Sequence, residues 1–176
     1  LSVANIKNII TGLGFELYTY VIDWEEFKDL QIAYFKSSVI DIEVPTDQLI
    51  YAIMYKVAKE QDIKYILEGS NFRTEYIMPP DWNFHAKFDL TNLRNIHNKY
   101  GTRKLNKFPS LSPNDRRIFN EIYDIQLVSI LNFVQFDLHA VVKRLKEEFN
   151  YAQYQYKHYE SIFTRFYQGY ILPRKF

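Results

Sequence analysis

The sequence IKYILEGSNFRTE, which spans Ile63–Glu75, carries the clearest structural signal in this chain. A short apolar run leads directly into a Gly-Ser-Asn turn, and Arg73, Thr74 and Glu75 follow it. In open α/β sheets, ligands bind just beyond the carboxyl ends of strands, where glycine lets the backbone approach the ligand and short polar side chains form hydrogen bonds. Ordinary strand-to-helix turns use the same residue types. The pattern therefore predicts a strand followed either by a nucleotide-binding turn or by a plain turn.

Predicted strands and helices alternate along the chain. The strands are expected at Phe15–Ile22, Lys64–Leu67 and Ile125–Leu131. Helices are expected at about 2–12, 24–37, 46–61 and 89–100, from Pro113 onward, and at about 137–149 and 156–170. Strands that alternate with helices pair in parallel through crossover connections. We therefore expect one α/β domain over residues 1–176.

The ends of several helices are marked by residues with capping roles. Asp23, with Glu26 three residues later, and Ser112, with a following proline, are predicted to begin helices. Gly12 or Gly14 is predicted to end the first helix, because glycine adopts the left-handed conformation of a helix terminus without steric cost.

The composition excludes several classes of protein. A 176-residue chain with 47% hydrophobic residues can bury one sizeable core. The net charge of +1 gives no polyelectrolyte surface for nucleic acid. There is no cysteine, which rules out disulfides and thiolate metal sites within this sequence. No apolar run reaches the ~20 residues that span a bilayer, so we expect a cytoplasmic protein without membrane insertion.

The last predicted helix has two different faces. One face carries an aromatic stripe that we expect to pack into the core, formed by Tyr159, Phe163, Phe166 and Tyr170. The other face is polar and contains His158, Ser161, Arg165 and Gln168, with Lys157, Glu160 and Thr164 beside it. The spacing alone indicates a solvated helix surface for this polar face.

The stretch at Ile63–Glu75 resembles the second signature of the PP-loop ATP pyrophosphatase superfamily. The fold implied is α/β, a Rossmann-like doubly wound parallel sheet of the adenine nucleotide alpha hydrolase type with strand order 3-2-1-4-5. The resemblance implies that Gly69, Ser70 and Asn71 face the adenylate and that Glu75 faces Mg²⁺ and pyrophosphate. The superfamily's SGGxDS phosphate loop does not occur in the sequence. We therefore expect a fold that is incomplete at its N-terminus, lacking its first two strands.

Two longer blocks, Phe27–Gln48 and Lys157–Phe176, are similar to the N-acetyl sugar amidotransferases of bacterial surface-polysaccharide and nonulosonic-acid synthesis. Trp82, the KYGT at Lys99–Thr102 and the FPSLS at Phe108–Ser112 extend the likeness. These enzymes convert the acetamido group of a nucleotide-linked sugar into an acetamidino group with ATP and ammonia. The resemblance implies ATP and Mg²⁺ as cofactors and a separate glutaminase subunit as the ammonia source, since no cysteine is present to act as the glutaminase nucleophile.

The same resemblance assigns roles to polar residues that local sequence explains in simpler ways. Asp47 lies in the first turn of a predicted helix, where a negative charge interacts favourably with the helix dipole. The family resemblance makes it a catalytic candidate instead. The other catalytic candidates are Arg165, Lys157 and Glu160, and the substrate-binding candidates are His158, Thr164, Lys36 and Arg103.

Two other functions remain open from the sequence. One is a tRNA-modifying PP-loop enzyme, against which the near-neutral charge and missing cysteines count. The other is a non-catalytic interaction module. Loss of the first strand would expose a sheet edge and an apolar face, so we expect a homodimer or larger species.

Overall fold

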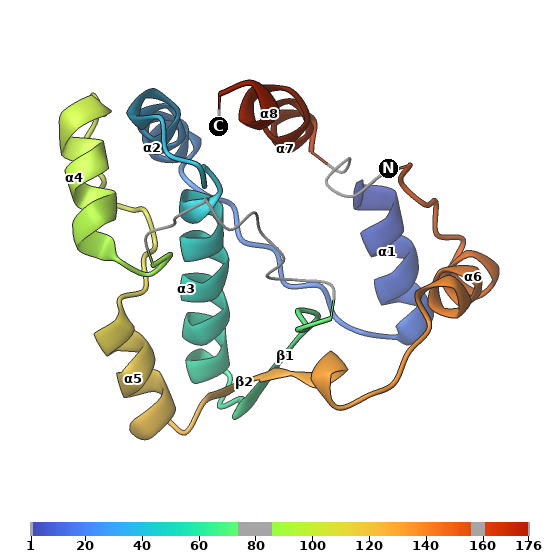
Figure 1. Cartoon of the computed structure of the whole chain (residues 1–176). Helices are drawn as coiled ribbons and strands as arrows, with labels where there is room; N and C mark the ends of the chain where they lie inside the picture. Colours follow the sequence, from blue (N-terminus) through green and yellow to red (C-terminus); the bar gives the residue numbers. More distant parts are fainter. Residues whose placement is uncertain (1, 74–85, 156–160, 176) are drawn as a thin grey trace. The chain divides into compact units, whose positions relative to one another are not determined.

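The computed structural model describes residues 2–73, 86–155 and 161–175. Its contacts group into two compact units, one made of residues 20–133 and the other of residues 1–19 together with 134–176. Figure 1 shows the elements of both units along the chain. Each unit is described separately below.

The unit of residues 20–133 contains a two-stranded parallel sheet together with helices α2 to α5. Its elements are α2 Trp24–Ser37, α3 Val44–Glu60, β1 Tyr65–Glu68, α4 Leu90–Tyr100, α5 Pro113–Glu121, β2 Gln126–Ser129 and the 3₁₀ turn η1 Ile130–Asn132. β1 and β2 pair in parallel, with Tyr65 opposite Gln126 and Glu68 opposite Ser129. The predicted mixed α/β class and the parallel pairing of these two strands are confirmed.

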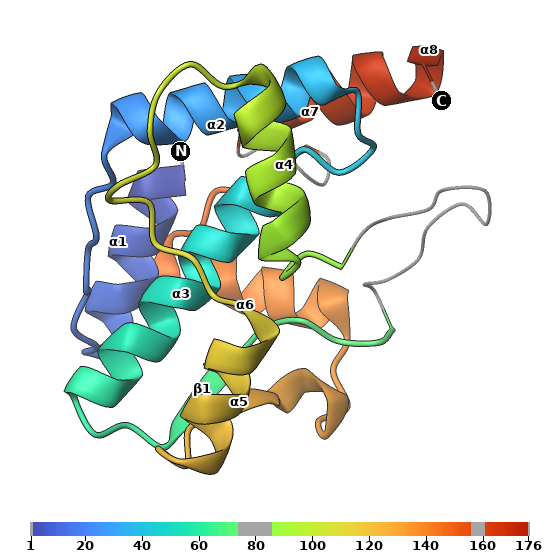
Figure 2. The ribbon, with the colours of Figure 1, turned by 90° about the vertical axis from the view of Figure 1, so that its left-hand side faces the viewer.

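One face of the sheet packs against helices of this unit. Ile66 and Leu127 contact a buried cluster whose centre is Tyr55 of α3, together with Leu111 and Ile125. A second cluster joins α2 to α4 through Leu30, Tyr34 and Leu93, and Figure 2 shows these two helices side by side. The other face of β1 is bare, because Tyr65 and Leu67 are 67% and 64% exposed.

A buried carboxylate holds α2 against the end of α4. Asp29 of α2 accepts hydrogen bonds from the backbone amides of Thr102 and Arg103 and from the Thr102 hydroxyl, and its Oδ2 lies 3.0 Å from His97 Nε2. Burial opposes ionisation of Asp29, but these hydrogen bonds outweigh it and hold its pKa well below the usual range. The carboxylate therefore stays ionised inside the unit.

Two further buried side chains fix the long connection from α4 to α5. Glu26 of α2 accepts hydrogen bonds from the amides of Lys107 and Phe108 at 2.8 and 3.0 Å. Gln48 of α3, which is fully buried, accepts from the Leu111 amide in this connection and also donates to the carbonyl of Lys87, which precedes α4. The backbone amides of an irregular segment have no partners in a helix or a sheet and need other hydrogen-bond acceptors. The side chains of Glu26 and Gln48 are those acceptors here.

The predicted helix caps are largely confirmed. The Asp23 side chain accepts from the Glu26 amide, and Ser112 forms a capping box with Asp115. Gly14 follows α1 with a φ of +67°, the left-handed conformation expected at a helix end. The helix predicted to begin at Thr46 begins earlier, at Val44, because Pro45 fits the first turn and the Thr46 hydroxyl donates back to Glu43.

The strand predicted at Phe15–Ile22 is wrong. The segment is irregular, and Phe15, Tyr18 and Val21 are 65%, 63% and 85% exposed. A strand needs ladder hydrogen bonds from a neighbour, and in the described part of the chain only β1 and β2 form a sheet. Aromatic and β-branched composition without a pairing partner does not make a strand.

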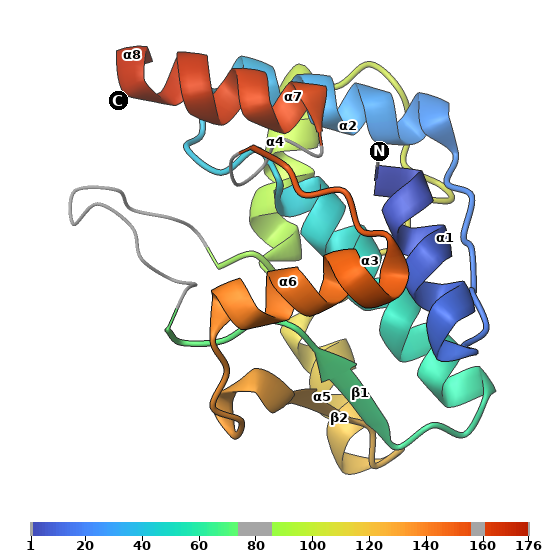
Figure 3. The same cartoon turned by 90° about the vertical axis from the view of Figure 1, so that its right-hand side faces the viewer.

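The other unit is helical in its described residues. Its elements are α1 Ser2–Leu13, α6 Leu138–Phe149, α7 Ile162–Phe166, the π-helical turn η2 Tyr167–Ile171 and α8 Leu172–Lys175. The Asn5 side chain forms two hydrogen bonds of 2.9 Å with the backbone of Ala152, which follows α6. Figure 3 shows the carboxyl end of α6 beside α1. Phe149, the last residue of α6, leaves no room for a Cβ at Gly12 of α1.

Two predictions about the last helix are corrected. The continuous helix expected over 156–170 begins at Ile162, because Ser161 is extended and its hydroxyl caps the Thr164 amide; residues 156–160 lie outside the described residues. The aromatic stripe expected in the core is half exposed, with Phe163, Phe166 and Tyr170 at 40%, 49% and 50%. Phe166 and Tyr170 stack on each other instead. Tyr159 falls outside the described residues.

We predict that Asp29→Asn destabilises the protein by about 3 kcal/mol, because an amide nitrogen would face backbone donors that now meet a charged acceptor. The lowered pKa of Asp29 gives a stabilisation that is present above the unfolded-state pKa of about 3.9 and is lost as pH falls below it. Urea unfolding at neutral and acid pH measures both effects. Glu121→Gln, at an exposed position of α5, is the control. Equal stability losses in the two variants would contradict the role of Asp29.

We also predict that Gly101→Ala destabilises the protein by about 1 to 3 kcal/mol, because a Cβ there would lie 2.5 Å from the His97 ring and 2.7 Å from the His97 carbonyl oxygen. Gly69→Ala is the matched control, since nothing lies within 4 Å of a Cβ at that position. Thermal unfolding of both variants checks this. Similar midpoints for the two would show that the Gly101 contact is relieved without cost.

Candidate functional site

The candidate site lies at the carboxyl ends of the two parallel strands. β1 ends at Glu68 and β2 ends at Ser129, and the register places these two residues opposite each other. The Gly-Ser-Asn turn follows β1 directly, so Ser70 returns to the same edge of the sheet. Ligands of open α/β sheets bind at this edge. We refer to Tyr51, Glu68, Ser70 and Ser129 as the strand-end cluster.

The strand-end cluster is a carboxylate surrounded by hydroxyl donors. Glu68 Oε1 accepts hydrogen bonds from Ser70 Oγ at 2.6 Å and from Ser129 Oγ at 2.5 Å. Glu68 Oε2 accepts from the Tyr51 hydroxyl of α3 at 2.9 Å. The two serine oxygens lie 3.4 Å apart. Three elements, α3, β1 and β2, therefore converge on one side chain.

These contacts keep Glu68 ionised. Partial burial of the carboxyl opposes ionisation, but hydrogen bonds from Ser129, Ser70 and Tyr51 and the charge of Arg116 outweigh it, so the pKa of Glu68 is lowered. Arg116 is half-buried in α5 and lies over the Phe88 ring. The site thus combines one stable negative charge with a nearby cation.

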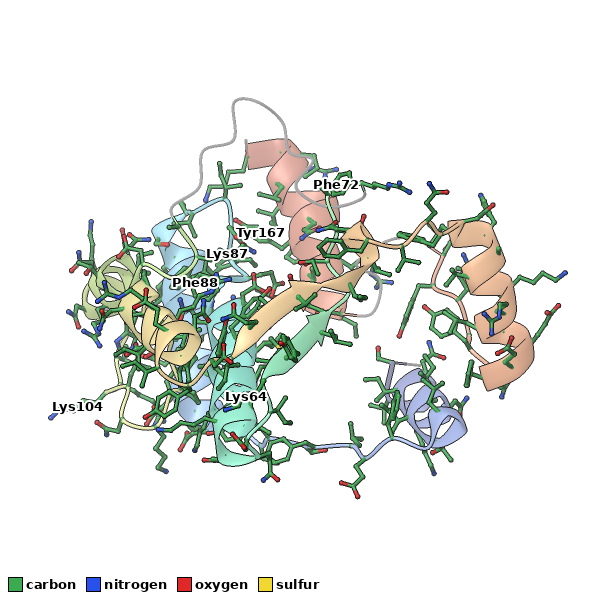
Figure 4. All side chains as sticks on the ribbon, turned by 90° about the horizontal axis from the view of Figure 1, so that it is seen from below. Lys64, Phe72, Lys87, Phe88, Lys104 and Tyr167 are labelled. Carbon is green, nitrogen blue, oxygen red and sulfur yellow. The ribbon has the colours of Figure 1, made fainter. Side chains whose placement is uncertain are left out.

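The turn after β1 is tied both to itself and to the end of β2. Asn71 is buried, and its Oδ1 accepts a hydrogen bond from the Arg73 amide at 3.1 Å, which closes a local turn. The Phe72 amide donates to Asn132 Oδ1 at 3.0 Å, which links this turn to η1 after β2. The Phe72 ring is 65% exposed, and Figure 4 shows it just beyond the ends of the strands, with Lys64 at the opposite end.

Space at this edge is open around Gly69. The residue is exposed, its φ is not in the left-handed region, and a Cβ would meet no atom within 4 Å. Among the described residues, therefore, no contact requires glycine at this position. The role predicted for Gly69, which is to give a ligand access to the backbone, stays a prediction.

Asp47 belongs to a separate group of charges, whose described interactions do not include Glu68, Ser70 or Ser129. Its carboxylate is paired with Lys87, whose Nζ also lies 3.2 Å from Asp41 Oδ2. Burial would lower the pKa of Lys87, but the two aspartates outweigh it and raise that pKa. Figure 4 shows Lys87 beside Phe88. Asp47 therefore has a charged partner within the fold, and the group of one lysine and two aspartates keeps one net negative charge.

The other predicted cations of this unit lie at its surface. Lys36 is exposed in the last turn of α2. Arg103 forms an ion pair of 2.9 Å with Glu25, with both side chains more than half exposed. Exposed pairs of this kind contribute about 0 to 1 kcal/mol. Neither residue contacts the strand-end cluster among the interactions the structure describes.

The remaining predicted residues fall in the other unit or outside the described residues. Thr164 and Arg165 lie in α7, where their amides donate to Ser161. Glu75, Lys157, His158 and Glu160 lie outside the described residues. Asn71 and Arg165 belong to different compact units, so a shared site for them stays a prediction. A cavity of about 490 Å³ along α6, lined by Leu138, Val142 and Lys146 among others, contains no predicted site residue.

Sequence reasoning missed Glu68, Tyr51, Ser129 and Arg116. Glu68 could have been found, because a charged residue that ends an apolar strand directly before a glycine is unusual enough to examine. Ser129 requires knowledge of the strand register. Tyr51 and Arg116 come from helices far away in sequence, and no local pattern points to them.

The described residues include no group of three or more His, Asp or Glu side chains that could hold a metal ion. Mg²⁺ that accompanies a nucleotide needs fewer protein ligands, because it keeps waters and phosphate oxygens. Among the helices of the described segments, none is sufficiently long and apolar to cross a membrane.

Comparisons with known proteins leave the family open. No family model, no curated protein and no solved structure matches this chain. The geometry of the strand ends therefore carries the argument that follows.

We predict that Ser129→Ala raises the pKa of Glu68, because the carboxylate loses the hydrogen bond from the Ser129 hydroxyl that favours its ionised form. A pH titration of the Glu side-chain carboxyl signals by NMR measures this. Ser37→Ala is the control, because the Ser37 hydroxyl donates to the Tyr34 carbonyl and not to Glu68. An unchanged Glu68 titration in Ser129→Ala would show that this hydrogen bond does not set the pKa.

Proposed function

We propose that this chain forms part of an ATP-dependent sugar amidotransferase of the PP-loop type, with a Rossmann-like doubly wound sheet. The reaction converts the acetamido group of a nucleotide-linked sugar into an acetamidino group, in the cytoplasmic synthesis of lipopolysaccharide, O-antigen or a nonulosonic acid. The observation that carries the proposal is the polar cluster at the carboxyl ends of two adjacent parallel strands, directly before the Gly-Ser-Asn turn.

The proposed chemistry has two steps. The acetamide oxygen attacks the α-phosphorus of ATP, an O–P bond forms, and the P–O bond to pyrophosphate breaks. Ammonia then attacks the imidate carbon, a C–N bond forms, and AMP leaves with the oxygen while the nitrogen loses its surplus proton. Ammonia comes from a glutaminase partner. Electrostatic stabilisation of pyrophosphate is the main catalytic requirement.

The residues of the chain divide between these tasks in the proposal. Ser70 and the backbone at Gly69 border the nucleotide, and Asn71 shapes the turn through its bond to the Arg73 amide. Glu75 serves as the Mg²⁺ ligand, and Arg165 stabilises phosphate charge.

A non-catalytic binding role is the second candidate. The bare face of β1, with Tyr65 and Leu67 more than 60% exposed, favours it, because soluble chains expose contiguous apolar surface mainly where a partner binds. The two candidates differ in one observable, which is turnover of ATP.

We predict that the full product of the gene encoding this chain, given Mg²⁺, ammonia and a nucleotide-linked diacetamido sugar, forms AMP and pyrophosphate in equal amounts with the amidine. Ser70→Ala should lower kcat/KM at least about tenfold, which corresponds to loss of about 1.4 kcal/mol of transition-state stabilisation. Asn98→Ala, at an exposed position of α4, is the control. Separation of nucleotides by chromatography measures the products.

Formation of ADP and phosphate would overturn the proposed chemistry. An unaltered rate in Ser70→Ala would remove the strand-end turn from the site. Absence of any ATP turnover, with retained binding to another protein through the Tyr65 face, would favour the second candidate.

A further inference from the structure

We propose that the strand-end cluster is a subsite for the vicinal 2′- and 3′-hydroxyls of a nucleoside ribose. The inference rests on the proposed function in one respect, namely that the ligand is a nucleotide. It goes further by naming the part of the nucleotide that is recognised and by assigning the recognition to Glu68, Ser70 and Ser129.

The argument begins with the positions of protons. Glu68 is ionised and has no proton to donate. The hydroxyl protons of Ser70, Ser129 and Tyr51 all point at its two oxygens. Each hydroxyl has one proton and two acceptor lone pairs. The hydroxyls can therefore only accept hydrogen bonds from a further partner.

An acceptor-only surface selects ligands that donate. A carboxylate has about four acceptor positions, and three of those on Glu68 are occupied. Among the described residues no other donor reaches the remaining position, which together with the acceptor lone pairs of Ser70 and Ser129 suits two adjacent hydroxyl donors. Phosphate oxygens lack donors and would meet the negative charge of Glu68, so they are excluded from this position.

A cation is a poorer occupant than a diol. Arg116 already lies close enough to lower the pKa of Glu68 by its charge. A second cation would be repelled by that guanidinium, whereas neutral hydroxyls would not. An acidic side chain at the end of a parallel strand is also the group that binds ribose hydroxyls in dinucleotide-binding folds.

The surroundings favour a nucleoside over a free sugar. Gly69 leaves open space directly beside the cluster. Phe72 lies four residues after Glu68, is 65% exposed, and is held at the same edge by the hydrogen bond that its backbone amide donates to Asn132 Oδ1. An exposed aromatic ring gives a stacking surface for a base. A single nucleoside would place its ribose hydroxyls at Glu68 and its base on the Phe72 ring.

The test compares two nucleosides on the full chain by NMR titration. Adenosine is expected to bind at least about tenfold more tightly than 2′,3′-dideoxyadenosine, because the analogue leaves the acceptors of the cluster unpaired. In Glu68→Gln the two nucleosides are expected to bind equally, since the glutamine amide replaces an acceptor by a donor. Glu121→Gln should retain the preference. Phe72→Ala should weaken both nucleosides alike.

Folding of each variant is checked by its NMR spectrum. Ser129→Ala is the milder second variant and should reduce the preference for adenosine several-fold with the fold intact. Equal binding of the two nucleosides to the unsubstituted chain would overturn the diol subsite and leave the proposed function standing. Free ribose binding as tightly as adenosine would overturn the role of Phe72. No binding of adenosine would overturn the subsite, while AMP formation would still decide the proposed function.

Discussion

The buried carboxylate of Asp29 is the interaction on which the larger unit depends. An ionised group inside a protein is tolerated only if its hydrogen-bonding capacity is filled, and the donors here come from Thr102, Arg103 and His97. The chain leaving α4 must therefore run back along α2. Glu26 and Gln48 continue this constraint as far as Leu111, immediately before the Ser112 cap of α5.

The strand-end cluster follows from that path. The connection ends in α5, and α5 leads into β2, which pairs with β1 without a shift between Glu68 and Ser129. Side chains alternate faces along a strand, so a slip of one residue would turn Ser129 to the other face. The register of the two strands thus positions the hydroxyl that donates to the Glu68 carboxylate.

The features that could be predicted from the sequence are those formed by residues close together in the chain. The Asp23 and Ser112 caps and the short strand before Gly69 involve residues within a few positions of one another. The segment Phe15–Ile22 has strand composition, but a strand also needs a neighbour, and none of its residues pairs with β1 or β2. The spacing of the residues around Ser161 predicted that it lies inside a helix. Its hydroxyl instead accepts a hydrogen bond from the Thr164 amide and caps the helix that begins after it. For the site, the turn residue Ser70 was predictable from the strand before it, whereas Glu68, Ser129 and Tyr51 meet only through register and helix packing.

The structure also separates two kinds of signal in the sequence. Gly101 and Thr102 of KYGT contact His97 and Asp29, and Phe108 and Leu111 of FPSLS contact Glu26 and Gln48. These residues hold the unit together, so a resemblance carried by them concerns the fold. The Gly-Ser-Asn turn is different, because Gly69 has no packing requirement and Ser70 directs its hydroxyl at a half-buried carboxylate. A residue type that folding does not demand, placed where open α/β sheets bind ligands, is the better indicator of chemistry. The functional argument for this chain therefore depends on four residues at the strand ends more than on its longer motifs.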